Sequence, residues 1–281
     1  MNPMKFNHAL LALDLSESSD DLVHCVGDLK DLGIEQVTLL TVISNPYPGG
    51  PEKFDTSSME EKLKNYASKV KNQGFQTDYK LKIESGTYAP VTILKEAKNL
   101  SADLLILGHR GHNRMAELIL GSVASEILQR ANMPVLLLRI SDQPGNNAVS
   151  ICKSLTKNFL IATDFSDNAD KMLSLFENQQ LKSSNVTLLY VRTSSAVKNE
   201  SEKLENRADK LRKKGVDKID TKILEGHVAL QIENFANKNN NTLIIMGAQG
   251  KGFVEQLFIG SNSLRVARLT SKPLLLIPAR N

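Results

Sequence analysis

Short runs of continuously apolar residues alternate along this chain with longer segments in which apolar side chains recur at helical spacing. The first run covers residues 6–13, and Leu22, Val23, Val26 and Leu29 follow it at helical spacing. Continuously apolar strands are typical of parallel sheets, because helices cover both of their faces. The pattern therefore predicts an α/β fold, built of β-α units around a doubly wound parallel sheet.

The second half of the chain repeats this pattern in the same order. The apolar run 159–163 is followed by Met172, Leu173 and Phe176 at helical spacing. Further runs match in the same order: 37–40 and 186–189, 104–107 and 243–246, 135–138 and 274–277. Five strands and four intervening helices fit each half. We therefore expect two copies of one small domain in tandem, each with its own five-stranded sheet.

A turn-rich stretch around Pro144 and Gly145 separates the two copies and cannot continue a strand or a helix. It predicts a first domain at residues 1–141, a linker at 142–157 and a second domain at 158–281.

The last strand of each copy, 135–138 or 274–277, is an apolar edge, and an exposed apolar edge invites pairing. The copies should therefore pack against each other as an internal pseudo-dimer. Whether whole chains also form a homodimer stays open.

A glycine frame follows the fourth strand of each copy. The first reads Gly108-His109-Arg110-Gly111, nine residues, then Gly121-Ser122; the second reads Gly247-Ala248-Gln249-Gly250, nine residues, then Gly260-Ser261. Glycines let backbone amides form a concave nest that a phosphate can approach, and a helix N-terminus adds free N–H groups. The frame predicts an anion site in each copy. The two serines either donate to a phosphate or serve only as helix N-caps.

The surroundings of the frame differ between the copies. His109, Arg110, His112 and Arg114 make the first loop basic, whereas Lys251 is the only cation of the second. These cations either form a solvated turn or help to hold phosphate. Two histidines without a carboxylate or cysteine partner are a weak metal signal, so no metal site is expected.

The first copy carries extra residues after its second strand, around residues 45–51, and after its third strand, near residues 87–90. Both additions lie at strand C-terminal ends, where open α/β sheets bind ligands. Gly86 and Gly226 follow the third strands, and we expect them at turns near the same pocket.

The glycine spacing, with Asp14 or Asp164 closing the first strand, resembles the universal stress protein family over both copies. The resemblance implies a strand order of 3-2-1-4-5, with ATP or another adenine nucleotide bound at the switch point, often with Mg²⁺. In that family the aspartate and the residue ending the second strand contact the nucleoside, and the glycines and serine hold the phosphates. With the neighbouring Gly86, Gly226 and Arg110, the candidate binding residues are Asp14, Val42, Gly86, Gly108, Arg110, Gly111, Gly121 and Ser122, then Asp164, Val191, Gly226, Gly247, Gly250, Gly260 and Ser261.

The two aspartates have a second interpretation that stays open. Aspartate is a common turn former, and Asp14 and Asp164 stand two residues before Ser16 and Ser166.

Composition limits the partners and the location. The net charge of +4 is spread along the chain without Lys/Arg runs, and aromatic residues make up 5%, so nucleic acid is not expected as a partner. The apolar stretch 9–13 ends at Asp14, too early for a signal peptide or a membrane span, which predicts a cytoplasmic protein without a membrane partner.

Cys25 and Cys152 are far apart and lack metal-site spacing, so two reduced thiols are expected.

Motifs of dedicated enzymes are missing from the sequence: it has no Walker A motif, no nucleophile elbow and no strand-one Rossmann glycines. The leading hypothesis is a nucleotide-binding stress-response protein that regulates by binding ATP and hydrolyses it slowly at most. A dimerising interaction module without nucleotide is the alternative, and a nucleotidyl transferase or hydrolase is the third hypothesis. The first copy should bind ATP at least as tightly as the second, because its loop is more basic.

Overall fold

The computed structural model describes residues 4–45, 55–85, 88–109, 120–139, 155–178, 181–182, 184–193, 198–249 and 259–279. In these ranges, no helix is both long enough and apolar enough to cross a membrane. The first half contains β1 (His8–Ala12), α1 (Glu17–Cys25), the 3₁₀ helix η1 (Val26–Leu32), β2 (Gln36–Asn45), α2 (Ser57–Asn72), β3 (Gln76–Ser85), α3 (Ala89–Asn99), β4 (Leu104–Gly108), α4 (Ser122–Arg130) and β5 (Val135–Leu138).

The second half repeats this order closely. It contains β6 (Asn158–Ala162), α6 (Asp167–Met172), the 3₁₀ helix η3 (Leu173–Glu177), β7 (Asn185–Arg192), α7 (Glu200–Lys213), β8 (Lys218–Glu225), α8 (Val228–Lys238), β9 (Leu243–Gly247), α9 (Ser261–Leu269) and β10 (Leu274–Ile277).

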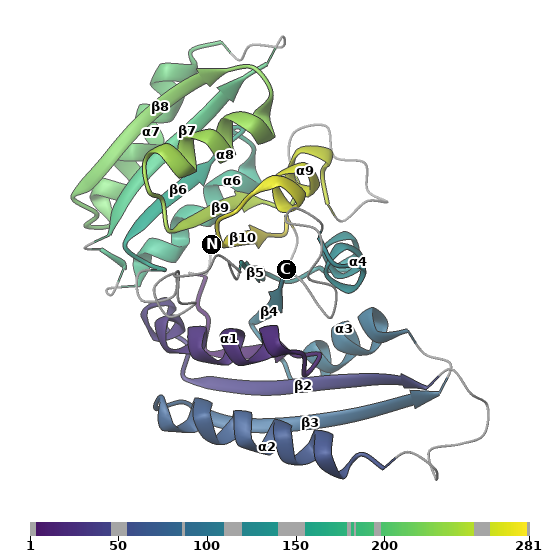
Figure 1. Cartoon of the computed structure of the whole chain (residues 1–281). Helices are drawn as coiled ribbons and strands as arrows, with labels where there is room; N and C mark the ends of the chain where they lie inside the picture. The colour runs from purple at the N-terminus through teal and green to yellow at the C-terminus, as the bar shows by residue number, and fades with distance from the viewer. Residues whose placement is uncertain are drawn as a thin grey trace.

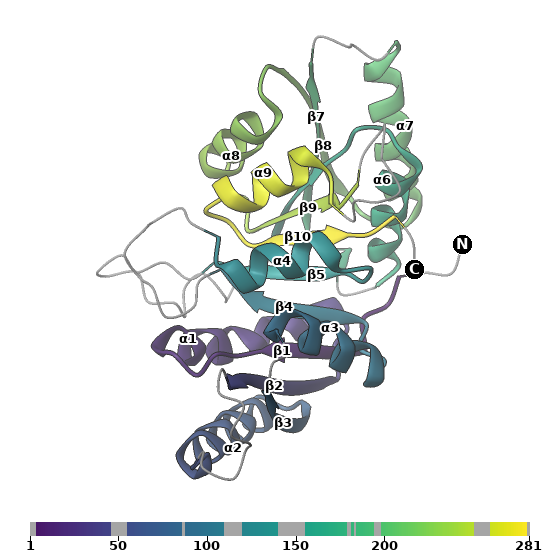
Figure 2. The ribbon, with the colours of Figure 1, turned by 90° about the vertical axis from the view of Figure 1, so that its right-hand side faces the viewer.

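All ten of these strands form one sheet, in the order β3-β2-β1-β4-β5-β10-β9-β6-β7-β8. The predicted order 3-2-1-4-5 is confirmed in each half, and the pairs within each half are parallel. β5 and β10 lie side by side at the centre of the molecule and pair antiparallel, with Leu136 opposite Leu275 (Figures 1 and 2). The predicted pseudo-dimer is thereby confirmed, and the two predicted five-stranded sheets join at their apolar edges into one sheet of ten strands.

Two apolar clusters fill the two faces of this sheet, and each cluster contains residues of both halves. Alternate side chains of a strand enter opposite clusters, as Leu10 and Leu11 do on β1. Helices α1, α2, α6 and α7 contribute to the first cluster, and α3, α4, α8 and α9 contribute to the second. The continuous apolar runs of the sequence follow from this arrangement, because both faces of each central strand are covered.

A second contact joins the halves away from the β5–β10 seam. Asp28 of η1 accepts a hydrogen bond from the Leu155 backbone N–H at 3.1 Å, and Asp31 accepts one from Thr156 Oγ1 at 2.8 Å. The Asn178 side chain donates to the Asp31 carbonyl at 3.2 Å. Residues 140–154, which include most of the expected linker, lie outside the described residues. The boundaries at residues 141 and 158 stay predictions.

Cys25, buried at the end of α1, is disulfide-bonded. The expectation of two reduced thiols is therefore wrong. Cys152 is the only other cysteine of the sequence and lies outside the described residues. A disulfide requires tertiary proximity, on which the spacing of two distant cysteines carries no information.

Candidate functional site

The strand order creates a switch point in each half. The chain leaves β1 toward β2 on one side and leaves β4 toward β5 on the other. In open α/β sheets the crevice that binds ligands lies at such a point, outside the carboxyl ends of the strands. Ala12 at the end of β1 pairs with Leu107, and Ala162 at the end of β6 pairs with Met246. Each aspartate of interest therefore lies at the same sheet edge as the first glycine of the glycine frame.

Backbone hydrogen bonds close each glycine loop at its base. The Gly121 N–H donates to the His109 carbonyl at 3.1 Å, and the Gly260 N–H donates to the Ala248 carbonyl at 2.7 Å. His109 and Ala248 in turn donate to the last residues of β5 and β10. The two ends of the loop are thus held together beside the last strand of each half. Gly111, Gly250 and Arg110 lie outside the described residues.

A helix N-terminus faces the carboxyl edge of the sheet just after each loop. Gly121 and Gly260 are the N-caps of α4 and α9, and both have extended backbone with ψ of 149° and 154°. Ser122 and Ser261 are the first helical residues and are exposed. The interpretation of these serines as N-caps is therefore wrong. The N–H groups of the first turn have no acceptor within the helix and carry partial positive charge, which suits an anion.

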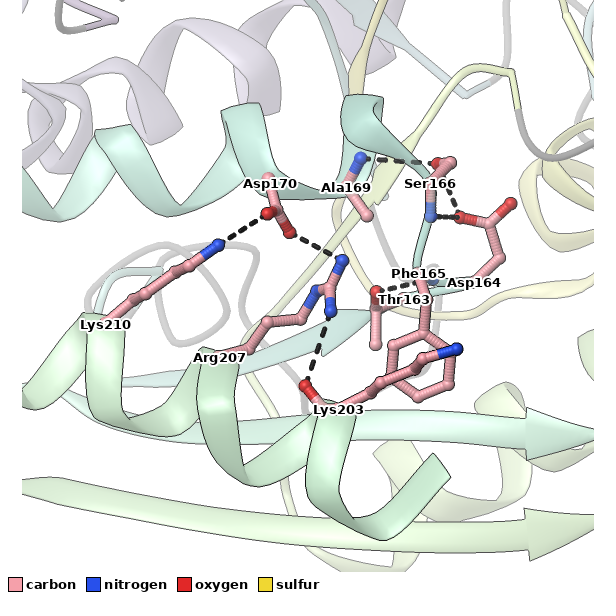
Figure 3. A network of polar contacts seen from close by, with 9 residues as sticks. All are labelled: Thr163, Asp164, Phe165, Ser166, Ala169, Asp170, Lys203, Arg207 and Lys210. Atoms are coloured by element: carbon pink, nitrogen blue, oxygen red, sulfur yellow. Dashed lines mark hydrogen bonds and ion pairs between the residues drawn. The ribbon is translucent and has the colours of Figure 1, made fainter. Parts of the chain in front are cut away.

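Asp14 and Asp164 each form the turn after the first strand of their half. Asp14 Oδ1 accepts hydrogen bonds from the Ser16 N–H at 3.0 Å and from Ser16 Oγ at 2.6 Å. Asp164 Oδ1 accepts the same two bonds from Ser166 at 3.0 Å and 2.6 Å (Figure 3). The turn-forming interpretation is confirmed for both. A contact with a nucleoside stays a prediction.

Val42 and Val191 lie near the ends of β2 and β7, and their side chains pack into the apolar cluster under α3, α4, α8 and α9. A contact of their backbone groups with a nucleoside stays a prediction. Gly226 has a φ of 122°, a conformation that side-chain-bearing residues rarely adopt, and its N–H donates to the Arg192 carbonyl at 3.0 Å. Gly86, its counterpart in the first half, lies outside the described residues.

Sequence reasoning missed an ion cluster beside Val191. Arg192, the last residue of β7, pairs with the buried Glu200 at the start of α7 and with Glu225 at the end of β8. The alternation of strands and helices predicts that Arg192, Glu200 and Glu225 lie at the carboxyl ends of their strands or just after them. It does not indicate which charged residues there form ion pairs with one another.

Gln249 of the second loop was also missed as a structural residue. It is buried, and its Oε1 accepts a hydrogen bond from the Ala279 N–H at 2.7 Å. The Ala279 carbonyl accepts a hydrogen bond from Lys171 of α6. The segment after β10 therefore connects the second glycine loop to α6.

Within the described ranges there is no group of three histidine, cysteine, aspartate or glutamate residues that could hold a metal ion.

Comparisons with known proteins agree with the fold and the repeat. A model of the universal stress protein family matches residues 5–139 and 156–278. Among curated relatives, universal stress protein Slr1230 of Synechocystis is 28% identical over 176 residues, 62% of this chain and 57% of that protein. Universal stress protein MJ0531 of Methanocaldococcus jannaschii is 33% identical over 121 residues, 41% of this chain and 71% of that protein.

A solved structure extends the likeness to the whole chain. The crystal structure of a universal stress protein from Archaeoglobus fulgidus is 25% identical, covers 96% of this chain and 98% of its own, and has a TM-score of 0.77. The chain therefore belongs to the universal stress protein family, with one family domain in each half.

Proposed function

We propose that this protein binds an adenine nucleotide, ATP above all, in the crevice of each half and acts through the bound state, with slow hydrolysis at most. The observation that carries the proposal is the repeated closure of the glycine loop onto a helix N-terminus capped by glycine, Gly121 in one half and Gly260 in the other. The same arrangement of closed loop and helix start, which suits an anion, is found at the switch point of both halves.

The phosphate end of each site would be the loop and the first turn of α4 or α9. Backbone N–H groups at a helix start bind phosphate oxygens without side-chain charge. The exposed hydroxyls of Ser122 and Ser261 stand at the same helix starts. Mg²⁺ usually takes one or two protein oxygens and completes its shell with phosphate oxygens and water, so these hydroxyls are the oxygens we expect beside it.

The nucleoside end would be the turn of Asp14 or Asp164 with the backbone of Val42 or Val191. The conformation of each aspartate is set by the bonds that its Oδ1 accepts within the turn. A carboxylate held in this way is preorganised for hydroxyl or amine donors of a nucleoside, which lowers the entropic cost of binding.

The test is the nucleotide content of the freshly purified protein, measured by mass spectrometry after denaturation, followed by an ATP titration of the stripped protein. We expect an adenine nucleotide in the first measurement and saturable ATP binding in the second. Absence of nucleotide, with no ATP binding at millimolar concentration, contradicts the proposal and favours the interaction-module hypothesis. Multiple-turnover product formation well above that of a Gly121→Asp/Gly260→Asp variant would favour an enzyme.

A further inference from the structure

Helices α2 and α7 contact α1 and α6, the helices that directly follow the turns of Asp14 and Asp164. In the first half, Asp20 of α1 accepts hydrogen bonds from Tyr66 Oη at 2.9 Å and from Lys69 Nζ at 3.1 Å, both on α2. In the second half, Asp170 of α6 pairs with Arg207 at 2.7 Å and with Lys210 at 2.6 Å, both on α7 (Figure 3). The same contact is therefore made twice.

The repeat is positional as well as geometric. Tyr66 and Arg207 precede the left-handed glycine after their helix, Gly74 or Gly215, by the same number of residues. Each is also followed three residues later by the lysine that binds the same aspartate. Chance pairing of surface charges does not account for the same contact at equivalent places.

Burial raises the pKa of Asp20, but hydrogen bonds from Lys69 and Tyr66, together with the charges of Lys69 and Lys62, hold the pKa below its ordinary value. The carboxylate therefore stays ionised at neutral pH and anchors α1 against α2.

One contact of α2 reaches the turn itself. Lys62 Nζ donates to the Leu15 carbonyl at 2.7 Å. Leu15 directly follows Asp14 and has a φ of 59°, in the left-handed region that a branched residue rarely adopts. Such a conformation persists only where its surroundings hold it. The hydrogen bond from Lys62 holds the carbonyl group of Leu15 in place.

The second half holds the equivalent residue through its side chain. Phe165 directly follows Asp164 and has a φ of 61°. The Arg207 guanidinium lies 5.1 Å from the centroid of the Phe165 ring, which also packs against Tyr190 at 4.5 Å. Figure 3 shows Arg207 reaching from α7 to Asp170 and to the carbonyl of Lys203, which it donates to at 3.3 Å. The side chain of Arg207 is only 11% exposed, so this cation–π contact is weakly screened by solvent.

We propose that Lys62 and Arg207 are positioning residues that fix Asp14 and Asp164 for contact with the nucleoside, one in each half. This inference rests on the proposed nucleotide sites. Both residues act through the left-handed residue beside the aspartate, Leu15 or Phe165, and neither acts on the phosphates. The two ends of a site are thereby supported by different elements: α4 or α9 at the phosphate end, and α2 or α7 at the nucleoside end.

The experiment isolates one site at a time. Lys62→Met is placed in a Gly260→Asp background, and Arg207→Met in a Gly121→Asp background, so that each variant reports on a single crevice. The exposed Lys64→Met on α2 and Lys213→Met on α7 are the matched controls. Dissociation constants are measured for ATP and for inorganic triphosphate, together with the thermal unfolding midpoint.

We expect Lys62→Met and Arg207→Met to weaken ATP binding about tenfold, the effect of losing one well-formed polar contact, and to leave triphosphate binding unchanged. The controls should bind both ligands as their backgrounds do. A loss shared equally by ATP and triphosphate, or no loss for ATP, overturns the positioning role. Absence of ATP binding in both single-site backgrounds overturns the proposed function and this inference together.

A rescue separates positioning from general destabilisation. Glycine adopts the left-handed region without strain, so Leu15→Gly should restore ATP affinity to Lys62→Met. Lys62→Arg, which keeps a donor on a long side chain, should retain most of the affinity. Failure of both substitutions to preserve ATP binding in a folded protein contradicts the inference for the first half.

Discussion

At the residue scale, single polar groups in this protein carry roles that their residue types alone do not reveal. Asp14 and Asp164 are turn formers by their hydrogen bonds, and their place at the switch point also makes them candidates for binding. Sequence reasoning could name both roles but not choose, because turn formation and ligand binding require the same carboxylate. For Ser122 and Ser261 the structure excludes one of the two roles, because glycines occupy the N-cap positions of α4 and α9.

Ser122→Ala and Ser261→Ala should therefore leave stability almost unchanged while they weaken ATP binding. The true N-cap Ser166, whose side chain accepts a bond from the Ala169 N–H, is the contrast. Ser166→Ala should cost about 1 kcal/mol of unfolding free energy, as cap removal usually does. Urea denaturation and ATP titration of the three variants check this. A cost of that size for Ser122→Ala or Ser261→Ala contradicts the assignment of the caps to the glycines, and unchanged ATP binding contradicts the binding role.

At the element scale, the hydrophobic pattern predicted the strands well because central parallel strands are buried on both faces. The runs 104–107 and 135–138 match β4 and β5 almost residue for residue. The 3₁₀ helices η1 and η3 were not anticipated, since their apolar residues, such as Val26 and Leu29, continue the helical spacing of α1. Hydrophobic spacing does not separate 3₁₀ from α geometry over so few residues.

The seam between β5 and β10 should be a strong stability determinant of the chain. Leu275 is fully buried there, opposite Leu136, and belongs to the apolar cluster shared by the two halves. We expect Leu275→Ala to lower the unfolding free energy by about 2–5 kcal/mol. Leu230→Ala on α8 is the control, because Leu230 is 49% exposed and should shift stability by less than about 0.5 kcal/mol. Equal effects of the two substitutions in urea denaturation would count against the seam.

At the scale of the whole molecule, the two halves behave as one body by sharing a sheet and both apolar clusters. The pseudo-dimer could be predicted because each copy ends in an apolar edge strand. Contacts such as Asp28 with the Leu155 N–H could not, because they join residues far apart in the sequence through polar groups that carry no periodic signal. The disulfide of Cys25 was also missed, because cysteine spacing in a sequence does not show which thiols lie close together in the fold.

Asp28 should make the interface pH-dependent. Burial raises the pKa of its carboxyl, and the charge of Asp31 adds to this, while the bond from Leu155 and the charge of Lys157 oppose it. The folded state then binds more protons than the unfolded state, so stability falls as pH rises from the ordinary value of 3.8 through the raised pKa.

Asp28→Asn removes this effect while it keeps an acceptor for Leu155. We expect a gain of less than about 1 kcal/mol at pH 7 that disappears as the pH falls below the ordinary carboxyl range. Thermal unfolding of both proteins between pH 3 and pH 7 measures it. A variant less stable than the parent at pH 7 would show that the ionised carboxylate, and not its neutral form, supports the interface.

The ranking of the two nucleotide sites depends on how the halves differ. Arg110 and Arg114 stand in the first loop, against Lys251 alone in the second, and cations near a triphosphate offset its charge, though modestly where solvent screens them. The extra residues 45–51 of the first half would lower the ATP affinity of the first site if they cover its nucleoside end.

We expect charge to outweigh the loop, because the backbone closure of the glycine frame is the same in both halves. The first site should then bind ATP at least as tightly as the second. Gly121→Asp and Gly260→Asp each place a carboxylate at a helix start where a phosphate should lie, so each should abolish one site. If Gly260→Asp removes most ATP binding in a calorimetric titration while Gly121→Asp leaves it unchanged, the second half is the working site. In that case the loop after β2 controls access more strongly than the basic residues raise affinity.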